Sequence, residues 1–320
     1  MTDFSTAFKG SRCVVFGGTG FLGSHVVDAL AGCGSSVTAF DLREPGQARD
    51  GVVAVVGDAT DDDAVRSCIA GADHIFAFAA GSGSVRSLAQ PLSDLRTSCQ
   101  MQLVLLEAVR VVAPGASVVF PGSRLEYGKA RVLPMAEDHP MAGTSPYAIH
   151  KITCDAYHRF YAETYGLRTV VLRIANPYGS HISGDPARAG TGIVNAFVDQ
   201  AIAGGTISLY GGGEQLRDLV FVDDVVRAAL LASVTDRAWG RAFNIGSGCG
   251  VSLRSVAEAV VAEVGSGAID VEAPWPADAA AVETGDFYFD VGLAREVLGW
   301  VPETGLREGI RALVQGSAGE

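Results

Sequence analysis

Residues 12–23 read Arg12-Cys13-Val14-Val15-Phe16-Gly17-Gly18-Thr19-Gly20-Phe21-Leu22-Gly23, and this stretch decides the fold. The apolar run at its start is typical of a buried parallel strand, and apolar residues recur at helical spacing after the glycines. Gly17, Gly20 and Gly23 permit a tight turn, a close approach of the backbone to a pyrophosphate and close packing of the helix, whose N-terminus faces the anion. The stretch therefore predicts a strand, a glycine loop and a helix that together bind a dinucleotide.

An acidic residue supports this interpretation, because the glycine spacing alone is a weak signal in a chain with 40 glycines. Asp41 ends the next apolar run, 18 residues after Gly23, where a carboxylate accepts hydrogen bonds from the adenosine ribose hydroxyls. This placement favours NAD. Arg43 follows two residues later and would suit the 2′-phosphate of NADP, which is the less favoured cofactor. A further alternative, that Asp41 only begins a turn, stays open.

Short apolar runs alternate with helical patterns through the first half of the chain, which is typical of a parallel sheet covered by helices on both faces. The expected strands are Arg12–Phe16, Ser36–Phe40, Val52–Val56, His74–Phe78, Ser117–Phe120 and Thr169–Ile174. The helical patterns between them include Gly20–Ala31, Asp61–Ala70 and Ser93–Val112. The sequence therefore predicts an α/β fold with a Rossmann-type, doubly wound parallel sheet.

The pattern becomes less regular after residue 175. Glycine-rich turns separate short strands there, and helices are expected near Ile193–Ala203 and Leu253–Val264. We expect residues 1–175 to form the dinucleotide-binding domain and to carry the catalytic residues. Residues 176–320 then form a smaller α+β part that binds the substrate and is partly interleaved with the first.

The composition argues against several classes of protein. The formal net charge is −12, whereas proteins that bind nucleic acid usually carry a basic face. The six cysteines fall singly, as in a reducing compartment, and no apolar run is long enough to span a membrane. The N-terminal segment lacks a signal-peptide pattern, so we expect a cytoplasmic protein. The six histidines show no metal-ligand spacing with carboxylates, so no metal is expected.

A tyrosine and a lysine four residues apart form the candidate catalytic pair. Tyr147 and Lys151 follow Ser145, which suits a helix N-cap, and Pro146, which suits the first helical position. The pair would share one helical face, where the ammonium and a cationic nicotinamide stabilise a tyrosinate that exchanges protons with a substrate hydroxyl. Ser123 follows the fifth expected strand, at the sheet edge where such folds bind ligands, and would orient the substrate oxygen. The alternatives, an exposed helical pair and a turn serine, stay open.

These motifs together resemble the NAD-dependent sugar epimerase/dehydratase family, a group of extended short-chain dehydrogenases/reductases. The resemblance extends almost end to end along the chain. It rests on the glycine loop, Ser123 with Tyr127-Gly128, Tyr147 with Lys151, Leu172–Gly179, Gly213–Asp218, Val222–Asp224, Phe243–Gly246 and Leu298–Pro302. Within the family, the segment Asn176–Asp185 is most similar in type to UDP-glucose/galactose 4-epimerases.

The resemblance implies that Ser123, Tyr147 and Lys151 form a catalytic triad. The motifs and the resemblance together place these residues at the cofactor: Gly17, Gly20, Phe21, Leu22, Gly23, Asp41, Arg43, Asp58, Ala59, Ala79, Ala80, Tyr147 and Lys151. The resemblance further implies that Ser123 contacts the sugar, and that Asn176 and Arg217 hold the diphosphate of a nucleotide-diphosphate sugar. A guanidinium suits this dianionic group, although without the resemblance Arg217 reads as a surface charge.

The residues after the triad serine depart from the dehydratase pattern. The 4,6-dehydratases of the family usually carry an Asp-Glu pair directly after the triad hydroxyl residue. This chain has Arg124 and Leu125 there, and Glu126 is one place too late to match. A dehydratase is therefore a minor option.

Other departures affect the cofactor pocket and the diphosphate. The fourth strand reads Ala77-Phe78-Ala79-Ala80 where the family usually has His-Leu-Ala-Ala, and Ser98 stands where the long helix usually has Asn. The arginine often found near Val282–Asp286 is missing, which leaves Arg217 with more of the diphosphate charge.

The leading hypothesis is a nucleotide-sugar 4-epimerase. Bound NAD would take hydride from sugar C4 while Tyr147 takes the hydroxyl proton, and the hydride would return to the opposite face. A 4-keto nucleotide-sugar reductase that consumes NADH or NADPH would use the same residues. A dehydratase or decarboxylase and a non-catalytic nucleotide-binding subunit are less favoured alternatives. The family also implies a homodimer, formed through the helices Ser93–Val112 and Pro146–Tyr165.

Overall fold

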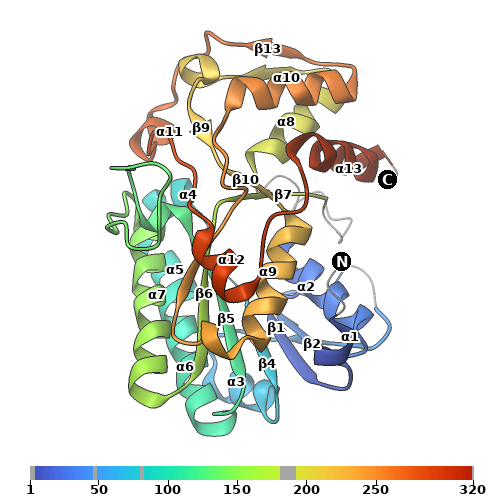
Figure 1. Ribbon diagram of the computed structural model, residues 1–320, viewed down its shortest axis with the longest axis vertical. Helices are drawn as coiled ribbons and strands as arrows, with labels where there is room; N and C mark the ends of the chain where they lie inside the picture. The colour runs from blue at the N-terminus through green and yellow to red at the C-terminus, as the bar shows by residue number, and fades with distance from the viewer. Residues whose placement is uncertain (1–3, 46–48, 80–82, 181–191, 319–320) are drawn as a thin grey trace.

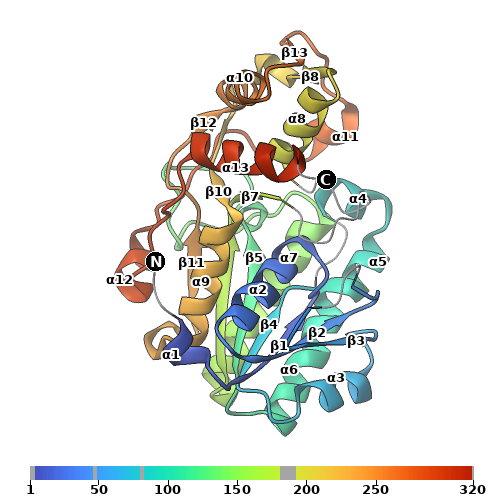
Figure 2. The same cartoon turned by 90° about the vertical axis from the view of Figure 1, so that its right-hand side faces the viewer.

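A seven-stranded parallel sheet forms the centre of the protein (Figures 1 and 2), in a computed structural model that describes residues 4–45, 49–79, 83–180 and 192–318. Its strands are β1 (Arg12–Phe16), β2 (Ser36–Asp41), β3 (Val52–Val56), β4 (His74–Ala77), β5 (Ser117–Ser123), β6 (Arg168–Ile174) and β11 (Ala242–Ile245). They lie in the order β11-β6-β5-β4-β1-β2-β3, and every neighbouring pair is parallel. The predicted Rossmann-type α/β class is confirmed.

Helices cover both faces of this sheet, as the all-apolar strands require. The helices are α2 (Phe21–Gly32) and α9 (Val222–Val234) on one face and α3 (Asp62–Ile69), α6 (Met101–Val112) and α7 (Pro146–Tyr165) on the other. Successive side chains of a strand point to opposite faces, so Cys13 and Val15 of β1 pack in the core with α2 and α9. Val14 and Phe16 pack in the core with α3 and α6. A strand in which polar and apolar residues do not alternate is therefore buried on both faces.

The structure differs from the predicted elements in three places. The seventh strand, β11, belongs to the second half of the chain and returns to pair with β6 at the sheet edge. β5 runs three residues further than expected and ends at Ser123. The expected helix Ser93–Val112 is instead α5 (Pro91–Leu95), a π-helical segment (Arg96–Gln100) and α6. Wider π-helical turns often occur at functional sites, and no local sequence pattern predicts them.

Much of the second part of the chain lies at one end of the long axis of the molecule (Figure 1). Its helices are α8 (Ile193–Ile202), α10 (Leu253–Val264), α11 (Ala277–Ala281) and α13 (Leu306–Ala318). Its strands form three small pairs, β7 (Asn176–Tyr178) with β10 (Leu219–Phe221), β8 (Thr206–Ser208) with β13 (Ala268–Asp270), and β9 (Leu216–Arg217) with β12 (Val251–Ser252). A separate apolar core that includes Val194, Val256 and Ile310 holds α8, α10 and α13 together.

Three short helices complete the description: α1 (Ser5–Phe8), α4 (Ser84–Ala89) and α12 (Gly292–Leu298). α12 belongs to the last third of the chain but packs against α9 and β11, next to the central sheet. Across the described ranges, no helix has both the length and the apolar character needed to cross a membrane. The elements that return to the sheet bring residues from distant parts of the chain to the carboxyl ends of the central strands.

Candidate active site

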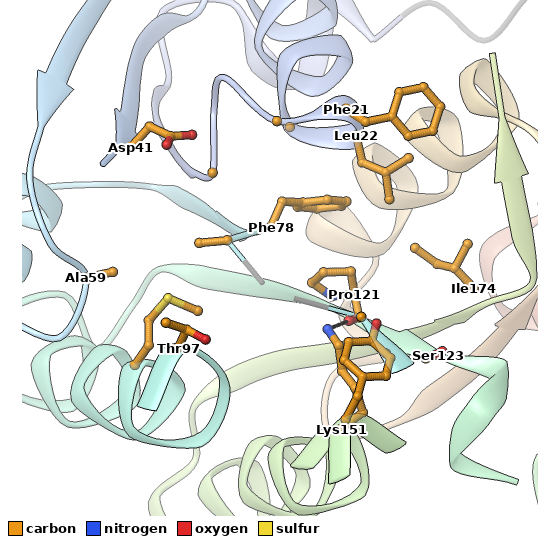
Figure 3. Close-up of a pocket in the computed structure, with 18 of the residues that line it drawn as sticks. Phe21, Leu22, Asp41, Ala59, Phe78, Thr97, Pro121, Ser123, Lys151 and Ile174 are labelled. Atoms are coloured by element: carbon orange, nitrogen blue, oxygen red, sulfur yellow. Dashed lines mark hydrogen bonds between the residues drawn. The ribbon is translucent and has the colours of Figure 1, made fainter. Parts of the chain in front are cut away.

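A cavity of about 760 Å³ lies at the carboxyl ends of β1, β2, β4, β5 and β6. This volume is in the range of sites that enclose cofactors and small substrates. Figure 3 shows Asp41 and Ala59 at one end of the cavity and Ser123 and Lys151 at the other, with Phe78 between them. The candidate nucleotide-binding residues and the candidate catalytic residues therefore share one continuous cavity.

The glycine loop between β1 and α2 leaves no room for larger side chains. Gly17 has φ +75°, and a Cβ atom on it would lie 2.6 Å from the backbone nitrogen of Ala79. A Cβ atom on Gly23 would lie 2.1 Å from the carbonyl oxygen of Gly17, so this glycine permits the close packing of helix and loop. Gly20 is the N-cap residue of α2 and lines the cavity, so the helix begins beside the cavity without a capping side chain. This geometry fits the pyrophosphate of a dinucleotide, which binds backbone N–H groups at a helix N-terminus.

Polar side chains from β2 and β3 line the far end of the cavity. The Oδ2 atom of Asp41 accepts a hydrogen bond of 3.1 Å from the backbone N–H of Thr19, which ties the carboxylate to the glycine loop. The Oδ1 atom of Asp58 accepts hydrogen bonds of 2.8 Å from both the backbone and the hydroxyl of Thr60. Asp41, Asp58 and Arg43 all line the cavity. Asp41, which favours NAD, and Arg43, which would suit NADP, thus lie at the same end of the cavity.

Most of the expected cofactor residues line this cavity. They are Gly17, Gly20, Phe21, Leu22, Gly23, Asp41, Arg43, Asp58, Ala59, Ala79, Tyr147 and Lys151. Ala80 lies outside the described residues. Further lining residues that the motifs did not identify include Phe78, Ser84, Arg86, Thr97, Met101, Pro121 and Ile174. Pro121 and Ile174 lie near strand ends and could have been found from that position, whereas Thr97 and Met101 reach the cavity through the π-helical segment and the start of α6.

The local sequence around Tyr147 explains why this residue lies in the first turn of α7. Ser145 is the N-cap residue, and its hydroxyl accepts a hydrogen bond of 3.2 Å from the backbone N–H of Ala148. Pro146 occupies the first helical position, as predicted. One helical turn after Tyr147, the side chain of Lys151 is only 3% exposed.

The ammonium of Lys151 is held in place between β5 and the tyrosine. Its Nζ atom donates a hydrogen bond of 2.6 Å to the carbonyl oxygen of Pro121. The same atom lies 4.5 Å from the ring centre of Phe120 and 5.8 Å from the ring centre of Tyr147. The pair is therefore not the exposed helical pair that was the alternative interpretation.

Ser123 ends β5 and begins a short 3-10 helix. Its backbone N–H donates a hydrogen bond of 2.6 Å to the Oε1 atom of Glu126, and its hydroxyl accepts one of 3.2 Å from the backbone N–H of Leu125. These reciprocal bonds form a capping box that fixes the backbone at the serine. Ser123 lines the cavity together with Tyr147 and Lys151.

Glu126 belongs to a buried charged cluster behind the cavity. The carboxyl group is fully buried, and its Oε2 atom lies 3.6 Å from the Nε atom of Arg173. The same guanidinium forms a shorter ion pair of 2.9 Å with Asp155. Burial, and then the nearby charge of Asp155, raise the pKa of Glu126 to about 8, while Arg173 acts in the opposite direction. Glu126 is not among the residues that line the cavity, so it does not replace the acidic pair of the dehydratases.

Arg124 and Asn176 also line the cavity, together with the candidate catalytic residues. The Nε atom of Arg124 donates a hydrogen bond of 3.0 Å to the Oδ1 atom of Asn176, and its Nη1 atom donates one of 2.9 Å to the hydroxyl of Thr284. Burial, and then the nearby charge of Arg217, lower the pKa of Arg124 to about 9. In the sequence, Arg124 stands out only as a departure from the dehydratases, and its position directly after Ser123 is the signal that could have identified it.

Arg217 does not line the cavity, although the resemblance placed it at the diphosphate. Its Nη2 atom donates hydrogen bonds of 2.7 Å to both carboxylate oxygens of Glu283, which lies in the segment where the family often has an arginine. Its Nη1 atom donates to the carbonyl oxygens of Leu216 and Gly285. The predicted diphosphate ligand is therefore already paired with a carboxylate in this structure.

The fold and the site define a nucleotide-dependent enzyme of the extended short-chain dehydrogenase/reductase type. A model of the NAD-dependent epimerase/dehydratase family matches residues 13–246, and the chain belongs to this family.

Similar proteins cover nearly the whole chain. The UDP-glucose 4-epimerase of Mycolicibacterium smegmatis is 32% identical over 318 residues, which are 95% of this chain and 97% of the relative. The structure of the UDP-glucose 4-epimerase of Thermotoga maritima with UDP-glucose has a TM-score of 0.85 and 30% identity, covering 96% of this chain and 99% of that one. The UDP-glucose 4-epimerase of Thermus thermophilus, in complex with NAD, has a TM-score of 0.84 and 29% identity over the same shares.

Proposed function

We propose that the protein is an NAD-dependent nucleotide-sugar 4-epimerase. One observation carries the proposal: the glycine loop and the set of Ser123, Tyr147 and Lys151 line the same cavity. The similarity to UDP-glucose 4-epimerases supports it. The absence of a carboxyl group at Arg124 and Leu125, both of which line the cavity, argues against the elimination of water that a dehydratase performs.

The residues of the chain divide the chemistry between them. Tyr147 exchanges the proton of the sugar C4 hydroxyl, and Lys151 stabilises the anion of the phenol. Ser123 orients the C4 oxygen through its hydroxyl. NAD, when bound, supplies a reversible hydride acceptor at its nicotinamide. Because C4 would be planar after oxidation, hydride returned to its opposite face would invert its configuration, and the cavity would have to let the sugar ring turn between the two transfers.

The cofactor is proposed to be NAD rather than NADP. The carboxylate of Asp41 lies at the end of β2 and is fixed by the glycine loop. A carboxylate there accepts hydrogen bonds from a ribose hydroxyl but repels a 2′-phosphate. Comparison of NAD and NADP binding by the wild-type protein and by Asp41→Asn tests this assignment, and tighter binding of NADP by the wild type would contradict it.

A homodimer is also proposed, formed through α5 and α7. The two helices pack side by side, as Figure 1 shows, and both carry exposed apolar side chains. Their exposed fractions lie between 42% and 76% for Leu92, Leu95, Ile149, Phe160 and Tyr165. A concentration of exposed apolar side chains of this kind is typical of a surface that a partner covers. Sedimentation velocity measures the state directly, and a monomer at micromolar concentration would contradict the proposal.

The decisive experiment supplies no cofactor. Purified protein is incubated with UDP-, dTDP-, GDP- and CDP-hexoses, and the sugar is followed by proton NMR. Appearance of the C4 epimer up to equilibrium supports epimerisation by NAD that stays bound through purification. If conversion appears only when NADH or NADPH and a 4-keto sugar are added, the protein is instead a reductase.

A matched variant tests the role of the tyrosine. Tyr147→Phe removes the phenolic oxygen but keeps the ring, so we expect a loss of turnover of about 10²- to 10⁴-fold with NAD binding retained. Turnover equal to that of the wild type would contradict the mechanism.

A further inference from the structure

The guanidinium of Arg124 is held in a fixed position by neutral groups. It donates one hydrogen bond to Asn176 of β7 and one to Thr284, which lies in the segment before α12. Its Cζ atom lies 4.2 Å from the ring centre of Phe287. These contacts fix the plane of the guanidinium, yet none of the three partners carries a negative charge.

A second arginine, Arg217, lies near Arg124 and repels its positive charge. Arg217 forms a bidentate ion pair with Glu283, so that carboxylate is already engaged. Among the described residues, no carboxylate forms an ion pair with Arg124 within 4.0 Å. The lowered pKa of Arg124 has burial as its first cause and repulsion by Arg217 as its second. The carboxylate of Glu283 acts on Arg124 in the opposite direction, but it is engaged by Arg217. A half-buried cation without an ion pair of its own is unfavourable, and an anionic ligand would offset that free energy.

Part of the guanidinium is free to bind a ligand. A guanidinium has five N–H donors, and a carboxylate or phosphate accepts two of them side by side. In Arg124 the Nε atom and one donor of Nη1 are used, whereas Nη2 has no acceptor within the ranges that the structure describes. Arg124 lines the cavity, so the remaining donors are next to the space that a substrate would fill.

We propose that Arg124 binds an anionic oxygen group of the substrate, and that this group is the carboxylate of a nucleotide-linked hexuronic acid. The inference rests on the proposed function, in which Ser123 and Tyr147 contact the C4 oxygen. Arg124 directly follows Ser123, and both residues line the cavity together with Tyr147. Arg124 is therefore a specificity-determining residue beside the reacting carbon.

Such a substrate has two anionic groups, at different places on the sugar ring. C5 is bonded to C4 and carries the carboxylate of a hexuronic acid, whereas the diphosphate is attached at C1, across the ring. A neutral hexose has a hydroxymethyl group at C5, which leaves the charge of Arg124 unpaired. Because the ring turns between the two hydride transfers, Arg124 contacts the carboxylate in one of its two orientations.

The test compares matched pairs of sugars in binding experiments. NAD-loaded protein carrying Tyr147→Phe, which prevents turnover, is titrated with UDP-glucose, UDP-glucuronic acid and their galacto epimers, and with the matched dTDP-, GDP- and CDP-sugars. Dissociation constants are measured by calorimetry with Arg124 present, with Arg124→Gln and with Arg124→Lys. Arg168→Gln is the control, because Arg168 is exposed and its guanidinium donates to the carbonyl oxygen of Gly115.

The expected result is a preference for the hexuronate that depends on Arg124. Arg124→Gln should reduce the ratio of hexose to hexuronate dissociation constants by about 10- to 100-fold for at least one epimer, as for loss of a charged hydrogen-bonded pair. Arg124→Lys should retain part of the preference, because it keeps the charge but not the fork. The control should leave the ratio unchanged. NAD binding and the thermal midpoint show that each variant is folded.

Other results would overturn the inference in distinguishable ways. Equal weakening of hexose and hexuronate by Arg124→Gln would mean that Arg124 contacts the diphosphate. No preference for the hexuronate in the presence of Arg124 would mean that the guanidinium has a structural role. If none of the nucleotide sugars binds, the proposed function fails and the inference fails with it.

Discussion

Glu126 gives a prediction that links the buried cluster to the stability of the protein. Its carboxyl group is fully buried, with Asp155 and Arg173 in the same cluster and Lys151 close enough to act on its charge. Arg173 pairs with both carboxyl groups, and its shorter ion pair is the one with Asp155, which also pairs with Arg159. We therefore expect Glu126 to hold a proton up to a pH near its raised pKa of about 8.

The sign of the pH dependence follows from the two states of the chain. In the unfolded chain Glu126 releases its proton near the ordinary pKa of 4.5, whereas in the folded protein it keeps the proton to about pH 8. The folded state thus binds more protons between these values, so the stability that depends on Glu126 is complete below pH 4.5 and is lost as the pH rises towards 8. Between pH 6 and pH 8 the loss amounts to about 2 kcal/mol, since one pKa unit corresponds to about 1.4 kcal/mol.

The perturbation is Glu126→Gln, which keeps the shape and cannot ionise. Its amide oxygen still accepts the N–H of Ser123, so the end of β5 should keep its conformation. Urea unfolding is measured at pH 6, 7 and 8. Over this range the free energy of unfolding of the wild type should fall by about 2 kcal/mol more than that of Glu126→Gln. Glu163→Gln, at an exposed position of α7, is the control. Parallel pH profiles for the wild type and Glu126→Gln would refute the reasoning.

Two further substitutions test the site. Lys151→Met should lower turnover, followed by proton NMR, by about 10²- to 10⁴-fold because it removes the ammonium that stabilises the phenolate. The control, Lys129→Met, lies at an exposed position and should not change the rate. Gly17→Ala should reduce the free energy of unfolding by about 2 to 5 kcal/mol and abolish NAD binding, because it combines a positive φ with a contact to the Ala79 backbone. Gly10→Ala is the matched control in urea unfolding, since Gly10 has a similar φ but open space around it; equal losses in the two variants would contradict the steric argument.

Local patterns predicted the elements that place the cofactor. The apolar strand and the glycine loop lead into α2 within residues 12–32, so neighbours in the sequence are neighbours in space. Likewise Ser145 and Pro146 predicted the start of α7, because N-capping and the first helical position depend on the backbone of the same few residues. The expectation that Tyr147 and Lys151 share a helical face depended on that start alone.

The sequence could not predict the charges around the substrate end. Arg217 and Glu283 are 66 residues apart, and Arg124 and Thr284 are 160 residues apart, so their contacts arise only when the second part of the chain packs over the sheet. The direction in which the side chain of Glu126 points could not be predicted either, because the burial of its carboxyl group depends on β6 and α7. The π-helical segment, which brings Thr97 to the cavity, also lacks a local signature.

The sequence by itself thus determined the fold class, the glycine loop and the set of Ser123, Tyr147 and Lys151, because each depends on short-range periodicity, capping or strand position. Only the tertiary structure decided that Arg124 lines the cavity and Arg217 does not. Arg217 is neutralised by a carboxylate from a distant segment, whereas Arg124 is fixed by neutral groups and keeps its charge beside Ser123. The physical reason is that an ion pair depends on distance in space, and sequence separation does not report that distance.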